Sequence, residues 1–247
     1  MMLRPAAGLL LALAVLTGCG GGGDSTSPAD EVLQTYFDDI ATQTVSSLRD
    51  AEREAQPGSP AAKYATYLKV STQAAIDGGQ KVDQRKLAAD RTNTGFKFCQ
   101  GQGSDQVCFT YTKVTRAAGK VADFRVNGKT IADRLAVGTG KASVFRGLDA
   151  QARFLAAYQT TARGDLLVVV RITAGAGQGL DAVKGAYGST GAAPADAAET
   201  FGPDTLEAGK SSNFMFAFPN TKVGGTLTLS TTAAPGGHPG TVALRTR

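Results

Sequence analysis

The sequence predicts an α+β protein, in which an N-terminal helical hairpin precedes an antiparallel β-sandwich. Two observations support this class. Apolar residues recur at a helical period within residues 30–79. From Gly95 onward, about eight short segments rich in β-branched and aromatic residues alternate with turns of Gly, Pro, Asn and Asp.

The chain begins with a pattern typical of export. Arg4 precedes an apolar run over residues 9–16, and the tetrapeptide Leu-Thr-Gly-Cys ends at Cys19. The run is shorter than the roughly 20 residues of a membrane-spanning helix, so it is typical of a secretory signal. A cysteine at the cut site resembles the lipobox of bacterial lipoproteins. The resemblance implies that residues 1–18 are removed and that Cys19 carries a lipid on the extracytoplasmic face of the cell membrane. Residues 19–29, rich in Gly and Ser, then form a flexible tether.

Residues 30–79 predict two helices joined by a short turn. The first helix begins near Asp30 and ends before Pro57. The second has strong start signals, because Ser59 can cap it and Pro60 occupies its first turn. It ends at the pair Gly78-Gly79. We expect the two helices to form an antiparallel hairpin, with their tyrosines used for packing.

Residues 90–232 predict the sandwich. Asn127-Gly128 lies between two strand-like runs and is a strong signal for a hairpin turn. The segment 166–172 is apolar at nearly every position, which predicts a strand buried on both faces.

Two later segments predict less order. Residues 185–209 are rich in Ala and Gly and predict a long loop. Residues 233–247 predict a loose tail, in which 241–244 could add an edge strand.

The chain has three cysteines, and once Cys19 takes lipid two remain. Cys99 and Cys108 each lie in a β-prone segment, and a turn-rich link separates them. This pattern predicts a hairpin with a cross-strand disulfide in an oxidising compartment. The alternative, a redox-active pair, requires closer spacing and a helix N-terminus, which the pattern does not offer.

The last third of the chain resembles the exported immunoglobulin-like modules of bacterial, in particular actinobacterial, lipoproteins. The resemblance is carried by four features: the strand 166–172, the turn Leu206-x-x-Gly209, the motif Phe214-x-Phe216-x-Phe218-Pro219 and the run Gly224-Gly225-Thr226-Leu227. It implies an immunoglobulin-like form for the predicted sandwich. It implies no site residues, because those modules have no agreed catalytic set.

The search for catalytic groups finds no complete set. The single histidine, His238, lies in a Gly/Pro-rich segment that suits a catalytic base poorly, and it excludes His-rich metal sites. Three acids of the β region, Asp123, Asp133 and Asp149, are the candidates for a carboxylate-dependent hydrolase of the cell envelope. The tripeptide Arg163–Asp165 matches an integrin-binding motif, although Gly and Asp are also ordinary turn residues.

The net charge of +5 arises from basic residues interspersed with acidic ones, which argues against nucleic-acid binding. We expect no cofactor, no metal and no enzymatic activity. The main prediction is a membrane-tethered binding module with a protein partner in the cell envelope, and the envelope hydrolase is the alternative. Solute binding for transport is disfavoured, since it usually requires two α/β lobes.

Overall fold

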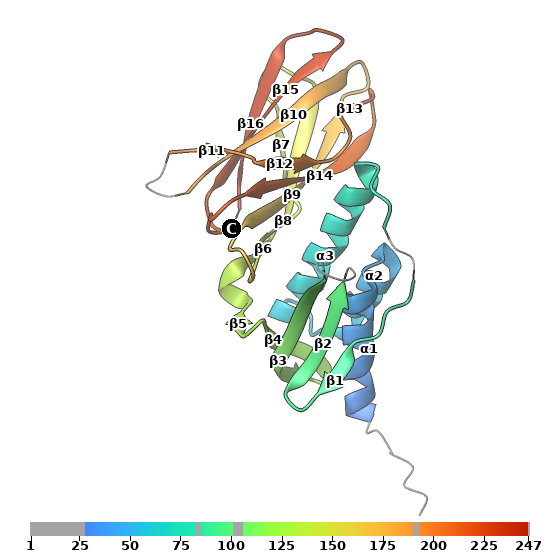
Figure 1. Cartoon of the computed structure of the whole chain (residues 1–247). Coiled ribbons are helices and arrows are strands. Elements are labelled where there is room, and N and C mark those ends of the chain that lie inside the picture. The colour runs from blue at the N-terminus through green and yellow to red at the C-terminus, as the bar shows by residue number, and fades with distance from the viewer. Residues whose placement is uncertain (1–27, 83–84, 101–105, 190–192, 247) are drawn as a thin grey trace, which may run out of the picture.

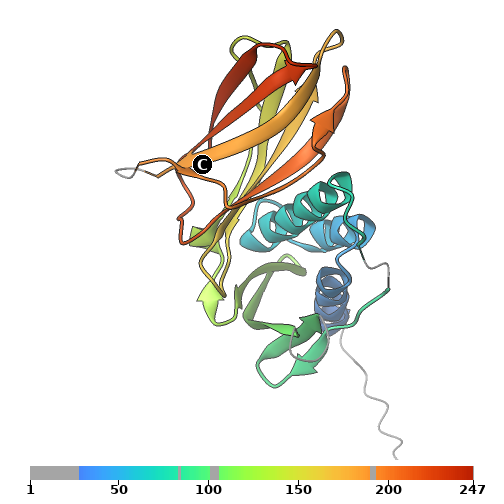
Figure 2. The same ribbon diagram turned by 45° about the horizontal axis from the view of Figure 1, so that its top comes forward.

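The structure is a computed structural model that describes residues 28–82, 85–100, 106–189 and 193–246. It confirms the α+β class: a three-helix region is followed by several antiparallel sheets (Figure 1). The helices and the first sheet lie at one end of the molecule, and the remaining sheets lie at the other (Figures 1 and 2).

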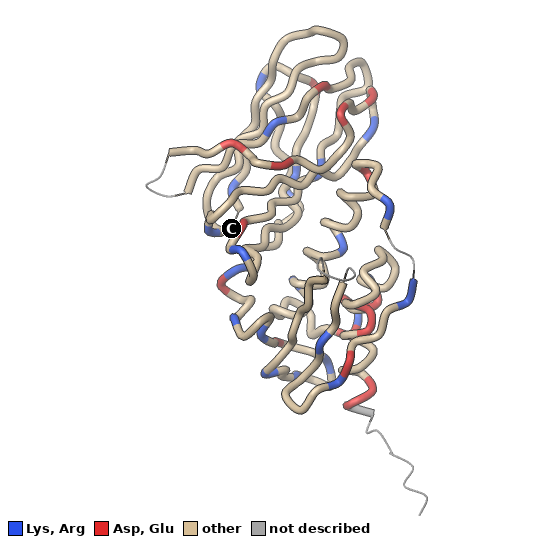
Figure 3. The backbone as a smooth tube through the Cα atoms, in the orientation of Figure 1, with Lys and Arg blue, Asp and Glu red and all other residues tan. Residues whose placement is uncertain are grey.

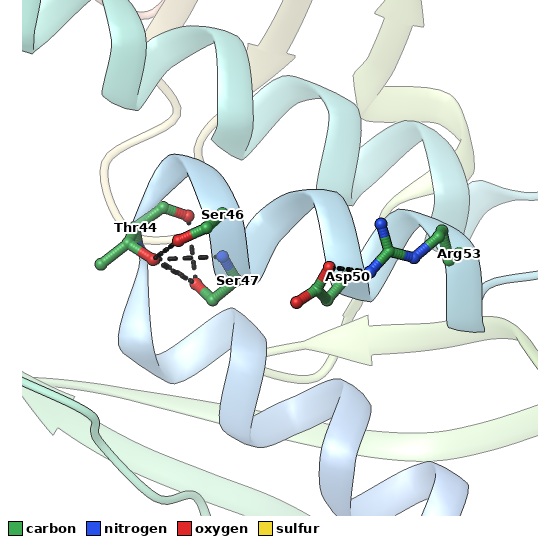
Figure 4. A network of polar contacts seen from close by, with 5 residues as sticks. All are labelled: Thr44, Ser46, Ser47, Asp50 and Arg53. Carbon is green, nitrogen blue, oxygen red and sulfur yellow. Dashed lines mark hydrogen bonds and ion pairs between the residues drawn. The ribbon is translucent and has the colours of Figure 1, made fainter.

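The N-terminal region contains three helices where two were predicted. They are α1 (Pro28–Thr42), α2 (Val45–Glu54) and α3 (Pro60–Asp77). The predicted first helix is broken at Gln43, whose φ of 52° is left-handed. Thr44 then starts α2 with a capping box: its side chain accepts from the Ser47 amide, and the Ser47 hydroxyl accepts from the Thr44 amide (Figure 4). The cap satisfies amide groups that a broken helix would leave without partners, so the break is stable.

Helix α3 begins as predicted. The Ser59 hydroxyl accepts from the Ala62 amide, and Pro60 occupies the first turn. Gly78, the residue after α3, lies close to the backbone of Gly202. A Cβ on Gly78 would lie 2.8 Å from the amide nitrogen of Gly202, so this glycine lets the end of α3 contact the β region directly.

The first sheet has the order β1-β2-β3-β4-β5. Its strands are β1 (Asp90–Thr92), β2 (Gly95–Gln100), β3 (Val107–Ala117), β4 (Lys120–Val126) and β5 (Lys129–Thr130). The predicted Asn127-Gly128 turn joins β4 to β5 with both residues at positive φ, as a type I′ turn requires. This sheet packs against the helices in one hydrophobic core, so the prediction of a single sandwich over residues 90–232 is wrong for its first part.

The second sheet, which we call the central sheet, has the order β12-β14-β9-β8-β6, with β7 also paired to β8. A short 3-10 helix, Ala132–Arg134, leads into it. Its strands are β6 (Leu135–Val137), β7 (Ala142–Val144), β8 (Ala150–Gln159), β9 (Leu166–Ala174), β12 (Glu199–Phe201) and β14 (Ser211–Phe218).

The third sheet has the order β11-β10-β15-β16, with β13 also paired to β10. Its strands are β10 (Gly179–Gly188), β11 (Ala195–Asp196), β13 (Thr205–Leu206), β15 (Thr226–Ala234) and β16 (Pro239–Arg245). Two predictions are corrected here. The predicted long loop over 185–209 contains the end of β10 and three short strands. The predicted loose tail 233–247 contains β16, which pairs with β15 along seven residues of each strand and buries Leu244. The prediction of a loose tail is therefore wrong, whereas the predicted edge strand at 241–244 is confirmed.

Strand β9 is buried on both faces from Leu166 to Val170, as predicted, whereas Arg171 is exposed. Val168 and Val170 belong to a core shared with the third sheet, whereas Val169 belongs to the core of the helices and the first sheet. Because neighbouring side chains in a strand point to opposite faces, this one segment separates two cores. The central sheet therefore lies between α3 on one side and the third sheet on the other.

A group of buried tyrosines joins α3 to both neighbouring sheets. The Tyr158 ring of β8 lies 5.4 Å from that of Tyr64 and 5.0 Å from that of Tyr67, and Tyr64 also contacts Tyr111 of β3. The expectation that the helical tyrosines serve packing is confirmed. Burial raises the pKa of Tyr158 to about 12, so its hydroxyl stays neutral at physiological pH.

None of the helices among the described residues is long and apolar enough to cross a membrane.

Val169→Ala tests the role of β9. Val169 is 0% exposed, so removing its methyl groups leaves a cavity in the helix-facing core and should lower the free energy of unfolding by about 2 kcal/mol. Val144→Ala is the matched control, since Val144 is 67% exposed and its loss should change stability by less than about 0.5 kcal/mol. Urea denaturation measures both, and equal effects would contradict the assignment.

Candidate functional site

The three cysteines were predicted to carry a lipid and to form a disulfide. Cys19 lies outside the described residues. Cys99 and Cys108 are joined by a disulfide, as predicted. They are direct partners on β2 and β3, with Cα atoms 4.0 Å apart, so the bond joins these two neighbouring strands of the first sheet.

The three acids proposed for a hydrolase are not brought together at a hollow. Asp123 lies on β4, where its carboxylate accepts a hydrogen bond from the Phe124 amide. Asp133 lies in the 3-10 helix and Asp149 immediately before β8, and both are exposed. None of them lines any of the three hollows of the described residues presented below.

The remaining candidates lie in turns. His238 is exposed between β15 and β16, and its backbone carbonyl accepts from the Ala233 amide. Arg163-Gly164-Asp165 lies between β8 and β9, with Gly164 at a φ of 81°. The Asp165 carboxylate accepts from the Asn220 amide at 3.4 Å, which is a turn-stabilising role.

A cluster of carboxylates between α1 and α2, formed by Asp39, Asp50 and Glu54, was not among the site residues predicted from the sequence. Burial and the charge of Asp50 raise the pKa of Asp39 to about 6. Burial and the charges of Asp39 and Asp50 raise the pKa of Glu54 to about 7. The Glu54 Oε2 atom is buried and has no hydrogen-bond partner among the described residues.

Strand β4 lies next to the Glu54 end of this partly buried cluster. The Gln56 amide donates to the Val121 carbonyl, and the Lys120 ammonium donates to the Arg53 carbonyl, so β4 lies against the end of α2. The Asp50–Arg53 ion pair lies on the exposed side of the same helix (Figure 4). The cluster can bind protons near neutral pH. Within the described parts of the chain no group of three His, Cys, Asp or Glu residues is placed to hold a metal ion.

The best candidate for a binding site is a groove between β7 and β16, with a volume of about 300 Å³. Arg146 and Thr241 form an antiparallel bridge just beyond β7, and the register of that bridge places residues 142–144 opposite 243–245. A hollow is found at that place instead of continued pairing. It is lined by Gly138, Thr139, Lys141, Ser143, Phe154, Ala243, Leu244 and Arg245.

The groove combines apolar and basic surface. Phe154 and Leu244 are buried residues of the core shared with the third sheet. Lys141 and Arg245 supply two positive charges, and the lining contains no acid. This chemistry suits an extended, acidic segment of a partner.

Two other hollows differ from the groove, one in charge and one in size. One of about 380 Å³ lies beside β10 and β15 and contains both Lys184 and Asp196, so its charges balance. One of about 80 Å³ lies on the central sheet and contains Arg153 and Arg171 without an acid. Across the described residues, basic and acidic positions are interspersed (Figure 3).

Comparison with known proteins finds no matching family model and no matching curated protein.

Glu54→Gln tests the carboxylate cluster. An acid whose pKa is raised by folding stabilises the folded state below its unfolded pKa, and this stabilisation is lost as pH rises through the folded value. The melting temperature should therefore fall between about pH 4.5 and pH 7, and the fall should be shallower in Glu54→Gln. Glu207→Gln, at an exposed acid of the third-sheet region, is the control. A steeper fall in Glu54→Gln would contradict the account.

Cys99→Ala/Cys108→Ala tests the disulfide. Its sequence separation is 9 residues, and a closed loop of about ten residues predicts a loss of about 2–3 kcal/mol of unfolding free energy in the chain-entropy model. Reduction of the wild-type protein should give the same loss, while the double variant should not respond to reductant. A wild-type protein insensitive to reduction would show that the bond does not stabilise the fold.

Proposed function

We propose that this protein is a non-enzymatic binding module, tethered by a lipid at Cys19 to the extracytoplasmic face of the membrane. In this proposal the central and third sheets form an immunoglobulin-like sandwich, and the groove between β7 and β16 binds an acidic segment of an envelope protein. The groove, with its two cations and no acid, is the observation that carries the binding function.

The Cys99–Cys108 disulfide supports the proposed compartment. Disulfides persist in exported proteins and are rare in reducing compartments. The bond also leaves Cys19 as the one cysteine outside the pair, which agrees with its proposed use for lipid attachment.

The packing of the last two sheets supports the proposed sandwich. Antiparallel strands of both sheets contribute to one core, with Phe214 and Phe216 on one side and Leu227 and Leu229 on the other. Two antiparallel sheets that face each other across one core are the defining feature of a sandwich.

The envelope hydrolase is the alternative proposal. It is favoured by one observation, that Asp39 and Glu54 have pKa values near the range that a general acid requires. Neither residue lines a hollow described above, so a substrate has no evident place beside them. We therefore favour the binding function.

Cys19→Ala tests the tether. The variant should move from the membrane fraction to the soluble fraction of cells, because it lacks the thiol that carries lipid. Cys99→Ala/Cys108→Ala is the control for loss of cysteine, and it should stay with the membrane. Persistence of Cys19→Ala in the membrane fraction would refute the anchor.

Capture from crosslinked cells tests the groove. Lys141→Glu/Arg245→Glu reverses both groove charges and should abolish recovery of the partner. Arg116→Glu, at an exposed position of the first sheet, is the control and should keep it. The binding proposal fails if no partner is recovered reproducibly, or if the groove variant recovers it as well as wild type.

A further inference from the structure

Two arginines lie side by side on the helix-facing side of the central sheet. Arg153 of β8 and Arg171 of β9 are direct cross-strand partners. Because alternate residues of a strand share a face, Arg171 lies on the same face as Val169, the residue that contacts the helix-facing core. Both arginines are exposed, since they lie at the place where α3 ends.

The end of α3 defines this place. Asp77, the last residue of α3, accepts hydrogen bonds from the Asn213 amide and the Ser212 hydroxyl. Asn213 is the cross-strand partner of Arg171, so the helix stops one strand away from the arginine pair. Beyond this point the face of the sheet is open.

Neither arginine is neutralised by the described part of the protein. No ion pair is found there between either guanidinium and a carboxylate. Asp77, which contacts the cross-strand partner of Arg171, already accepts hydrogen bonds from Gln73, Ser212 and Asn213. Like charges placed directly opposite on neighbouring strands destabilise a sheet, so this pair has a cost in the absence of an anion.

Both arginines line a hollow of about 80 Å³. Its lining also includes Gln151 and Thr173, whose amide and hydroxyl add hydrogen-bonding groups. The hollow is far smaller than the roughly 300–1,000 Å³ of ordinary ligand pockets, so it suits a single small group.

We propose that Arg153 and Arg171 bind a phosphate group, as a phosphate monoester or free phosphate. Guanidinium forks match the oxygens of phosphate in two-point hydrogen bonds. The two positive charges match the charge of about −1.5 to −2 that a phosphate monoester carries at pH 7. The site is separated from the groove by β7, and it requires neither the groove partner nor the lipid tether.

Thermal unfolding of the purified full-length protein in inorganic phosphate tests the site. Phosphate should raise the melting temperature above that in chloride of equal ionic strength. Arg153→Gln and Arg171→Gln should each raise the phosphate concentration that gives half of this stabilisation about tenfold or more. Arg116→Gln, which removes the same charge from the first sheet, should keep it.

The same variants show whether the fold survives. In buffer without phosphate, Arg153→Gln and Arg171→Gln should melt no lower than wild type, because each removes a like-charge contact. The proposal is overturned if phosphate gives no stabilisation beyond that of chloride, or if both variants respond to phosphate as wild type does.

Vesicles distinguish a lipid source from a soluble one. In a Cys19→Ala background, which removes the proposed lipid, the protein is sedimented with phosphatidylcholine vesicles with and without phosphatidate. Sedimentation that requires phosphatidate and both arginines assigns the site to a lipid headgroup, whereas stabilisation by inorganic phosphate without sedimentation assigns it to a soluble phosphate. Absence of both responses refutes the site, and capture of the groove partner would be unaffected by that result.

Discussion

Burial of the central sheet on both faces is the constraint on which the rest of the structure depends. Val168 and Val170 contact the third sheet, while Val169 contacts the helix-facing core. The apolar surface buried on each face contributes several kcal/mol to the free energy of unfolding. The helical region and the third sheet are therefore both firmly packed on the central sheet. The tyrosine contacts between α3 and β8 strengthen the same junction.

The covered part of this sheet also determines where function is possible. Helix α3 ends at Asp77. Beyond its end, Arg153 and Arg171 are exposed on the helix-facing side of the sheet. The neighbouring strand β7 separates that face from the groove beside β16. The proposed phosphate site and the proposed partner groove therefore both lie beside β7, on different sides of this strand.

Sequence patterns predicted the features that depend on local chemistry or strong periodicity. The Asn127-Gly128 turn, the start of α3 at Ser59 and the doubly buried strand 166–172 are of this kind. The break at Thr44 was missed because a capping box of Thr and Ser interrupts a continuous apolar period without Gly or Pro. The carboxylate cluster depends on the packing of α1, α2 and β4, and the arginine pair depends on the exact register of β8 against β9, which a β-bulge shifts; a single sequence reveals neither.

Amide hydrogen exchange in rising, sub-denaturing urea tests most directly whether the central sheet unites the two cores. The slowest amides of α3 report on the helix-facing core, and those of β15 report on the core shared with the third sheet. The account predicts one common free energy of opening and one common urea dependence for both sets. Exchange of the α3 amides at a distinctly lower free energy, while β15 stays protected, would contradict it.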